Sequence, residues 1–265
     1  MAAGTGDRRP LTAFDRYADW YDAFNEAKNY DAEVRYLLRI VAEVASPPRR
    51  WLDIGSGTGH HAAALAARGI DVDGVELSPA MVARARRAYP HIRFHLGSAQ
   101  DFALEGDRDV ISMLFHVVNY QTSDAMLRTA FARVAAHLAP SGLLLLDFWN
   151  SDAVLNDPPV RRVREAGVDG RPLFRISTPR EDRDRRRIDV LYEFRWDSPD
   201  GSLVHEELHT LRHFTSGELA EFLGQAGLTV MRCDAWMQDR PLSADDWYGL
   251  ICARRDPGGP AMDPS

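Results

Sequence analysis

The amino-acid sequence predicts an α/β fold: a Rossmann-like, doubly wound and mainly parallel sheet, with a helical arm at the N-terminus and a small antiparallel β insertion late in the chain. Three observations lead to this prediction. Short apolar runs alternate with helix-patterned segments between residues 51 and 148, which is typical of βαβ units. Three alternate glycines follow the first apolar run. The regular alternation then stops at Asn150.

Two helices are expected ahead of the sheet, in an arm that spans residues 11–46. Apolar residues recur at helical spacing in Tyr17–Phe24 and Asp31–Val44, where Val34, Leu37 and Val41 fall on one face. Residues 1–10 are rich in Gly, Arg and Pro and are expected to be disordered.

Residues 47–150 are expected to form the ligand-binding core. Ser78 followed by Pro79 indicates a helix start, because serine caps free N–H groups and proline suits the first turn. In chain order we expect strand Trp51–Ile54, helix His60–Arg68, strand Val72–Val75, helix Pro79–Ala88, strand Ile92–Leu96, strand Val110–Phe115, helix Asp124–His137 and strand Leu143–Phe148.

Residues 151–214 depart from this alternation, and we expect them to form a small antiparallel sheet over one end of the core. Ser198-Pro199-Asp200-Gly201 is a hairpin turn signal within it. Its strands are expected at Val160–Val168, Pro172–Thr178, Arg187–Trp196 and Leu203–His213.

Residues 215–255 return to the core pattern. Ser216–Ala226 is an expected helix that ends before Gly227, and Thr229–Trp236 and Trp247–Ala253 are expected as the last strands of the main sheet. Residues 11–255 are therefore predicted to form one domain. The Pro- and Gly-rich residues 256–265 are expected to be a disordered tail.

Composition limits the partners and the compartment. The net charge of −7 argues against a nucleic-acid substrate, because phosphate-tracking proteins usually carry a basic face. Cys233 and Cys252 lack metal-ligand spacing, so we expect neither disulfides nor a metal site, and we expect a reducing cytoplasm. No run approaches the roughly twenty apolar residues of a membrane span, so no membrane partner is expected. A homodimer is left open.

The glycine-rich turn predicts a nucleoside-cofactor site. Gly55, Gly57 and Gly59 follow the first strand, and residues without a Cβ let a ligand lie against the backbone of a sharp turn. Glu76 ends the next strand, where a carboxylate can accept both ribose hydroxyls. Asp53, two residues before the first glycine, suits a cationic amino group better than a pyrophosphate.

The pattern D-x-G-x-G-x-G resembles the first motif of the class I S-adenosylmethionine-dependent methyltransferases. A nicotinamide or flavin enzyme, whose fingerprint is G-x-G-x-x-G, and a glycine-rich turn without a ligand are the alternatives. The resemblance implies S-adenosyl-L-methionine as cofactor. It implies these binding residues: Tyr21, Tyr30, Asp53, Gly55, Ser56, Gly57, Gly59, Glu76, Leu77, Met81, Ser98, Ala99, Gln100 and Phe115.

The loop after the third core strand resembles the segment that contacts adenine in that family. Ser98 stands where the family commonly has an aspartate that accepts from the adenine amino group. The contact is therefore expected to pass to Asp101 or to the backbone, with a plain polar loop as the alternative.

The N-terminal segment is unusually aromatic for a surface arm. It resembles the lid of the N-methyltransferases of nucleotide-linked amino sugars, with Tyr21 and Tyr30 as the residues carried over. A lid would exclude water from a reactive sulfonium. The alternative is an apolar stripe that packs the arm onto the sheet.

Residues beside the transferred methyl are expected at the carboxyl ends of the strands. The resemblance places His116 there, with Asn119 and Tyr120 one turn on, and Asp147 and Trp149 at the next strand end. A capping role for His116 and a core role for Trp149 are the alternatives. The catalytic candidates are His116, Tyr21 and Asp147, and the substrate-binding candidates are Tyr17, Tyr120, Trp149 and His209.

The segment His205-Glu206-Glu207-Leu208-His209 spells H-E-x-x-H. That motif binds zinc on a helix, but a Pro-Asp-Gly turn and alternating residues indicate a strand here. On a strand His205, Glu207 and His209 share a face, and a solvated face is favoured over a substrate-facing histidine. The basic run Arg183–Arg187 is expected to be a solvated turn, with a contact to an anionic diphosphate as the alternative.

The function expected from this resemblance is methyl transfer to a small molecule, such as an amino-sugar nucleotide or another natural-product intermediate. Holding the nucleophile, methyl carbon and sulfur in line would supply most of the catalysis. The alternatives are an O-methyltransferase with a histidine base, a nicotinamide-dependent oxidoreductase and a non-catalytic cofactor-binding protein.

Overall fold

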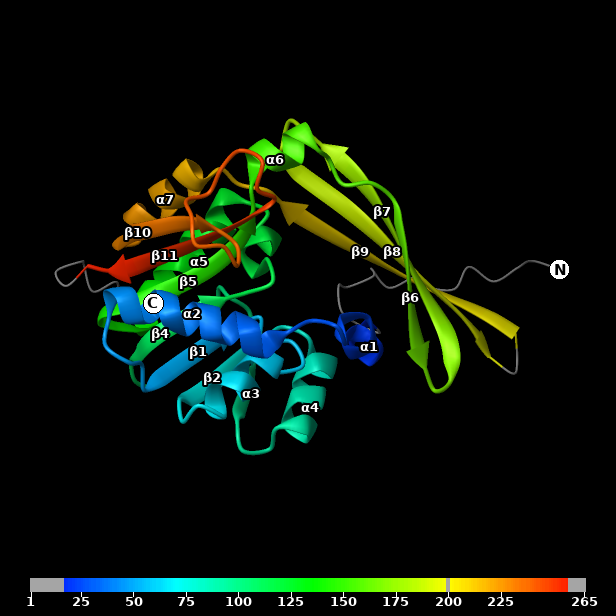
Figure 1. Ribbon diagram of the computed structural model, residues 1–265, viewed down its shortest axis with the longest axis horizontal. Coiled ribbons are helices and arrows are strands. Elements are labelled where there is room, and N and C mark those ends of the chain that lie inside the picture. The colour runs from blue at the N-terminus through cyan, green and yellow to red at the C-terminus, as the bar shows by residue number, and fades with distance from the viewer. Residues whose placement is uncertain (1–16, 199–200, 257–265) are drawn as a thin grey trace.

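Two separate sheets organise the chain, as the computed structural model shows (Figure 1). The structure describes residues 17–198 and 201–256. The predictions for residues 1–10, for the tail from residue 257 and for the two central turn residues Pro199 and Asp200 lie outside the described residues. No helix within the described ranges is both long and apolar enough to cross a membrane.

The larger sheet has seven strands in the order β10-β11-β5-β4-β1-β2-β3. Neighbours from β3 to β5 are parallel, and β11 is antiparallel to both β5 and β10. This confirms the predicted Rossmann-like, mainly parallel sheet. The strands are β1 (Arg50–Ile54), β2 (Asp71–Glu76), β3 (Arg93–Leu96), β4 (Arg108–Met113), β5 (Leu138–Trp149), β10 (Leu228–Ala235) and β11 (Tyr248–Arg255).

Helices cover both faces of this sheet, and each layer has its own apolar cluster. On one face pack α2 (Tyr30–Val44), α3 (His60–Ala66) and α4 (Pro79–Ala88); on the other pack α5 (Asp124–His137) and α7 (Ser216–Gln225). Five central strands contribute side chains to both clusters in alternation, as a sheet buried on both faces requires. The predicted bounds of α4 and α5 are confirmed. The side chains of Ser78 and Ser123 cap the two helices and fix where they begin.

The smaller sheet is an antiparallel meander, β6-β7-β8-β9. Its strands are β6 (Arg162–Val168), β7 (Arg171–Asp182), β8 (Arg187–Ser198) and β9 (Gly201–Arg212). Asn150 bridges Phe214, so this segment leaves and rejoins the core at one place. A short helix, α6 (Ser151–Asn156), precedes the sheet in a segment for which the sequence predicted no element, and the Asn150 side chain caps it.

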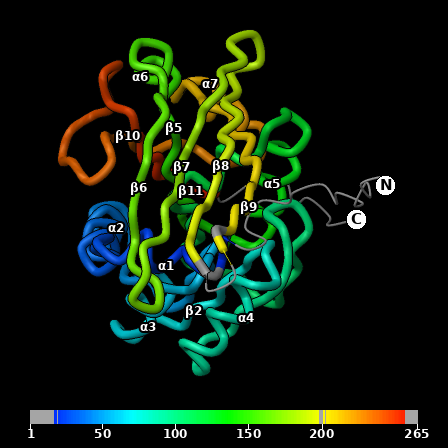
Figure 2. Tube along the Cα trace, turned by 90° about the vertical axis from the view of Figure 1, so that its right-hand side faces the viewer, coloured from blue at the N-terminus to red at the C-terminus, as the bar shows by residue number. Residues whose placement is uncertain are grey.

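The part of the N-terminal arm that precedes α2 lies between the two sheets (Figures 1 and 2). Its described residues form a 3-10 turn (Tyr17–Asp19) and α1 (Tyr21–Asn25), and α2 completes the arm. Its buried Tyr17, Trp20 and Phe24 pack with Phe194 of β8 in a cluster of their own. The aromatic stripe of the arm therefore packs on the antiparallel sheet rather than on the main one.

Candidate active site

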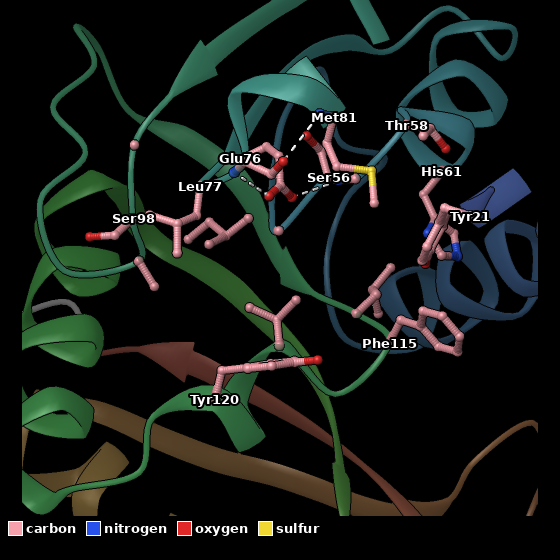
Figure 3. A pocket seen from close by; sticks show the side chains of 18 of the residues that line it. Tyr21, Ser56, Thr58, His61, Glu76, Leu77, Met81, Ser98, Phe115 and Tyr120 are labelled. Carbon is pink, nitrogen blue, oxygen red and sulfur yellow. Dashed lines mark hydrogen bonds between the residues drawn. The ribbon is translucent and has the colours of Figure 1, made fainter. Parts of the chain in front are cut away.

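A cavity of about 720 Å³ opens at the carboxyl ends of β1, β2 and β4 (Figure 3). The chain crosses from one side of the sheet to the other between β1 and β4, and ligands of open α/β sheets bind at such a switch point. Thirteen predicted site residues line it: Tyr21, Tyr30, Gly55, Ser56, Gly57, Glu76, Leu77, Met81, Ser98, Ala99, Gln100, Phe115 and Tyr120.

The glycine turn after β1 forms one wall of the cavity. Gly57 has a left-handed backbone, with φ of +56°, and a Cβ built there would meet nothing within 4 Å. Gly55 is also left-handed, and its Cβ would lie 2.2 Å from a methyl group of Val117. The turn therefore needs glycine at Gly55 for close packing and at Gly57 for a backbone that faces open space.

Glu76 holds this turn from the tip of β2. Its Oε2 accepts from the Gly57 N–H at 2.9 Å and its Oε1 from the Ser78 N–H at 2.8 Å. Burial raises the pKa of Glu76 above its ordinary value, although these N–H groups favour the charged form. Because each carboxylate oxygen has two lone pairs, both can also accept a ligand hydroxyl from the cavity.

The loop that follows β3 forms the far end of the cavity. Gly97, Ser98, Ala99 and Gln100 line it, whereas Asp101 accepts the Ser98 N–H at 2.6 Å and so fixes the loop. The side chain of Leu77 is 70% exposed on the facing side. An apolar side chain left in a cavity mouth suits the face of a flat ring.

Aromatic side chains from the arm close the opposite end. The Tyr30 ring stacks on His60 with centroids 4.7 Å apart, and the Tyr30 hydroxyl is buried without a hydrogen-bond partner among the described residues. Tyr21 lies edge-on to Phe115 at 6.3 Å. An orphaned hydroxyl, the open space at Gly57 and the Glu76 carboxylate together fit a polar nucleoside cofactor.

A charged pair lies behind this aromatic end. Glu33 accepts from His61 Nε2 at 2.7 Å and pairs with the Lys28 ammonium at 3.2 Å. That ammonium, from the only lysine in the sequence, lies 3.8 Å from the centroid of the Phe115 ring. Burial raises the pKa of Glu33, but the hydrogen bond from His61 and the charge of Lys28 outweigh it and lower the pKa overall.

Asp22 of α1 fastens the arm to the glycine turn. Its Oδ1 accepts from the Thr58 hydroxyl at 2.6 Å and from His60 Nε2 at 3.1 Å. Burial raises the pKa of Asp22, but the hydrogen bonds from His60 and Thr58 outweigh it, so that the pKa is lowered. The arm is therefore held over the cavity by an ionised carboxylate.

The predicted catalytic pair, His116 and Asp147, lies behind the cavity wall. Phe115 and His116 both have left-handed backbones, with φ of 63° and 57°, and Asp147 Oδ1 accepts the His116 N–H at 2.8 Å. Burial lowers the pKa of His116 to about 3 and raises that of Asp147 to about 7. His116 is thus a weak base, and the pair stabilises a strained turn that presents Phe115 to the cavity.

Other predicted residues also lie outside the cavity wall in the described part of the chain. Asp53 is buried and accepts from the Ser112 hydroxyl at 2.7 Å, and a Cβ on Gly59 would lie 2.7 Å from the Phe94 ring. Trp149 is partly buried and packs beside His116 and against an apolar cluster at the base of the antiparallel sheet, outside the cavity wall. Tyr17 and His209 belong to a buried cluster on the antiparallel sheet.

The prediction of a solvated face for His205, Glu207 and His209 is wrong. The side chains share one face, as expected of a strand, but Glu207 is 0% and His209 1% exposed. The arm covers this face, and Glu207 accepts the Tyr17 N–H at 2.8 Å. The alternation of residues in the sequence predicts that these three side chains share a face of the strand, but it does not predict which segment packs on that face.

Several cavity residues were missed by the sequence reasoning. Thr58, His60 and His61 belong to the turn already identified, so their adjacency to Gly57 and Gly59 was the available signal. Gln121 and Met126 follow β4, and Gln121 accepts a hydrogen bond from Gln100. No local pattern indicates that these two segments meet.

The fold and the cavity define a nucleoside-binding site of Rossmann-like type, and known proteins give the chemistry. Residues 52–142 match the family described as a methyltransferase domain. The dTDP-3-amino-3,6-dideoxy-alpha-D-glucopyranose N,N-dimethyltransferase of Streptomyces fradiae is 30% identical over 80% of this chain and 84% of that protein. The chain therefore belongs to the S-adenosylmethionine-dependent methyltransferases, which decides against the nicotinamide-dependent alternative.

Solved structures agree over nearly the whole chain. A sugar N-methyltransferase of Streptoalloteichus is 25% identical with a TM-score of 0.80, and the match covers 97% of this chain and 99% of that one. An amino pentose methyltransferase of Micromonospora echinaspora, solved with S-adenosylmethionine bound, is 27% identical with a TM-score of 0.73. That match covers 94% of this chain and 100% of the other. The cofactor is S-adenosylmethionine, which supplies an activated methyl group.

Replacing Gly57 by valine should weaken cofactor binding at least about tenfold. A β-branched side chain at a left-handed position costs roughly 1–2 kcal/mol and fills the space beside Glu76. Calorimetric titration with S-adenosylhomocysteine measures the effect. Gly69→Val is the matched control, because Gly69 has φ of +81° and open surroundings outside the cavity. Equal affinities of the two variants would contradict the placement of the cofactor.

Replacing Asp22 by alanine should loosen the arm and weaken cofactor binding by about 1 kcal/mol, or roughly fivefold, since two hydrogen bonds to a half-exposed carboxylate are lost. The pKa of Asp22 is lowered when the arm is closed. The higher cofactor affinity of the wild type over Asp22→Ala should therefore be lost as pH falls through that pKa. Titration with S-adenosylhomocysteine at several pH values tests this. Glu26→Ala, which removes an exposed charge from the same arm, should bind like the wild type.

Replacing Asp147 by asparagine should stabilise the fold at high pH. The pKa of this carboxyl is about 7 in the folded chain and about 3.9 when unfolded. The protonated Asp147 carboxyl therefore stabilises the folded chain fully below about pH 4, and this stabilisation is lost as pH rises through about 7. Thermal unfolding from pH 5 to 9 should show the variant gaining on the wild type by on the order of a few kcal/mol. The control variant Asp152→Asn, at an exposed position, should have the same pH dependence of stability as the wild type. If Asp147→Asn also has the wild-type pH dependence, the raised pKa of the buried Asp147 carboxyl is refuted.

Proposed function

We propose that this methyltransferase transfers the methyl group of S-adenosylmethionine to the amino group of a nucleotide-linked amino sugar. The observation that carries the proposal is the extent of the likeness. Matches to amino-sugar methyltransferases run through the antiparallel sheet and the arm as well as the cofactor core. Tyr21 of the arm lines the cavity, and the antiparallel sheet packs against the arm.

The cavity offers distinct places for the two reactants. The cofactor would lie along Gly57, Glu76 and the loop at Ser98, and the acceptor amine would approach between Tyr21, Phe115 and Tyr120. In this arrangement the protein acts mainly by orientation, since an amine with a free lone pair attacks the activated methyl without a strong base. His116 would serve by shaping the turn at Phe115, because its weak basicity does not suit a hydroxyl acceptor.

The domain division predicted from the sequence fits this proposal. Residues 47–150 would hold the cofactor and residues 215–255 would complete the core sheet. Residues 11–46 would close over the cofactor, and residues 151–214 would face the acceptor. The bridge between Asn150 and Phe214 supports the boundaries of the insertion.

Incubation with S-adenosylmethionine and a panel of dTDP-amino sugars tests the proposal, with products identified by mass spectrometry. We expect methylation of at least one amino sugar, and no methylation of the matched sugar that carries a hydroxyl in place of the amine. The free amino sugar without its nucleotide should be a much poorer acceptor. Methylation of the hydroxyl sugar, or of none of the amines, would contradict the proposal.

A further inference from the structure

Three arginines lie on the inner face of the antiparallel sheet, the face that packs against the arm (Figure 1). Arg164 of β6 stands directly opposite Arg175 of β7, and Arg162 precedes Arg164 by two residues, so all three side chains leave the sheet on the same side. Arg175 identifies this side, because its Cζ lies 5.6 Å from the centroid of the Tyr17 ring and 5.0 Å from that of the Phe24 ring. The cluster therefore faces the arm.

The charge of this cluster is not balanced within the described chain. None of the three guanidinium groups forms an ion pair with a carboxylate of residues 17–198 and 201–256. Arg162 and Arg164 are exposed, and the Nε of Arg175 is buried without a hydrogen-bond partner among those residues. Like charges that face each other across two strands are destabilising, and a guanidinium has five donors and no acceptor. An anion would satisfy both the charge and the donors.

The basic run Arg183–Arg187 differs from this cluster, because its charges are already paired. Three of its arginines form ion pairs with carboxylates of the described chain: Arg183 with Glu181 at 3.0 Å, Arg185 with Asp182 at 3.1 Å and Arg186 with Glu218 at 2.8 Å. An anion at the run would compete with these carboxylates. The inner-face arginines are therefore the better site for an anionic diphosphate.

One end of the arginine cluster is joined to the cavity through the arm. Arg175 donates to the Tyr17 hydroxyl, and the Tyr17 ring centroid lies 5.4 Å from that of Tyr21, which lines the cavity. Tyr192 lies within reach of two of the arginines. Burial raises the pKa of Tyr192, and the charges of Arg175 and Arg164 oppose that rise. The two guanidinium groups thus act on one phenol beside the arm.

The other end of the cluster reaches the main sheet. Arg162 acts on Tyr248, the first residue of β11: burial raises the pKa of this phenol, the charge of Asp147 adds to the rise, and the charge of Arg162 opposes it. The Tyr248 ring stacks on His116 with centroids 5.6 Å apart, and the preceding Phe115 lines the cavity. The arginines therefore border the aromatic end of the cavity, which the arm closes.

We propose that Arg162, Arg164 and Arg175 bind the diphosphate of the nucleotide-linked acceptor. This rests on the proposed function, in which the amine belongs to a sugar that carries a nucleotide. Guanidinium groups pair with phosphate through two parallel hydrogen bonds, and a diphosphate offers several oxygens for such pairs. With its diphosphate on the arginines, the acceptor would extend its sugar past the arm toward Tyr21 and Phe115. The cluster would then select the nucleotide-linked sugar over the free sugar.

Calorimetric titration with dTDP tests this site without turnover. In the presence of S-adenosylhomocysteine the wild type should bind dTDP, and thymidine, which lacks the diphosphate, should bind at least about tenfold more weakly. Arg162→Gln and Arg164→Gln should each weaken dTDP binding by roughly tenfold, because each removes a charged donor pair. Both side chains are exposed and unpaired in the described chain, so both variants should fold and should bind S-adenosylhomocysteine like the wild type.

Two control variants remove the same charge elsewhere. Arg195→Gln changes the outward face of the same sheet, where Arg195 pairs with Glu193. Arg183→Gln changes the basic run. Both should bind dTDP with the wild-type affinity, since the overall charge of the protein changes equally in all four variants.

The site is overturned if Arg162→Gln and Arg164→Gln bind dTDP like the wild type, or if Arg195→Gln weakens binding as much as they do. Inorganic pyrophosphate, which lacks the nucleoside, should bind more weakly than dTDP, and tighter binding would overturn the assignment to a nucleotide. Failure of the proposed function looks different: a wild type that binds dTDP through Arg164 but methylates no amino-sugar nucleotide. That result would refute the function and support the diphosphate site.

Discussion

The hydrogen bond between the Gly57 N–H and the Glu76 carboxylate is the contact on which the site depends. It ties the turn after β1 to the tip of β2, and both strands end at the same edge because they are parallel neighbours. The bond requires a left-handed backbone at Gly57, which only glycine adopts at little cost. The turn, the open wall of the cavity and the position of the Glu76 carboxylate in that wall all follow from this one geometry.

A second set of polar groups connects the arm and the antiparallel sheet to that turn. Asp22 fastens the arm to Thr58 and His60, and Glu207 fastens the start of the arm to β9. Asp22 is half-exposed, whereas Glu207 is buried, and burying a carboxylate costs stability unless its hydrogen bonds are satisfied. These hydrogen bonds fasten the arm beside the cavity, which is the position that a lid over the reacting groups requires.

The sequence was sufficient for what depends on local pattern. Alternating strands and helices predicted the sheet, and the glycines with Glu76 predicted the cavity wall, because their spacing is set by one βαβ unit. It could not place His116 or His209, because their surroundings come from distant segments. His116 turns away from the cavity through two successive left-handed residues, and His209 is buried by an arm nearly two hundred residues earlier. In the packed structure neither of these two imidazoles lines the cavity.

The most direct test of this account is calorimetric titration of the purified wild-type protein with S-adenosylhomocysteine, with NADH as the comparison ligand. Both ligands carry adenosine, but this turn reads G-x-G-x-G and has His60 where the dinucleotide fingerprint has its third glycine. The account predicts binding of S-adenosylhomocysteine and none of NADH. Binding of NADH with no binding of S-adenosylhomocysteine would contradict it.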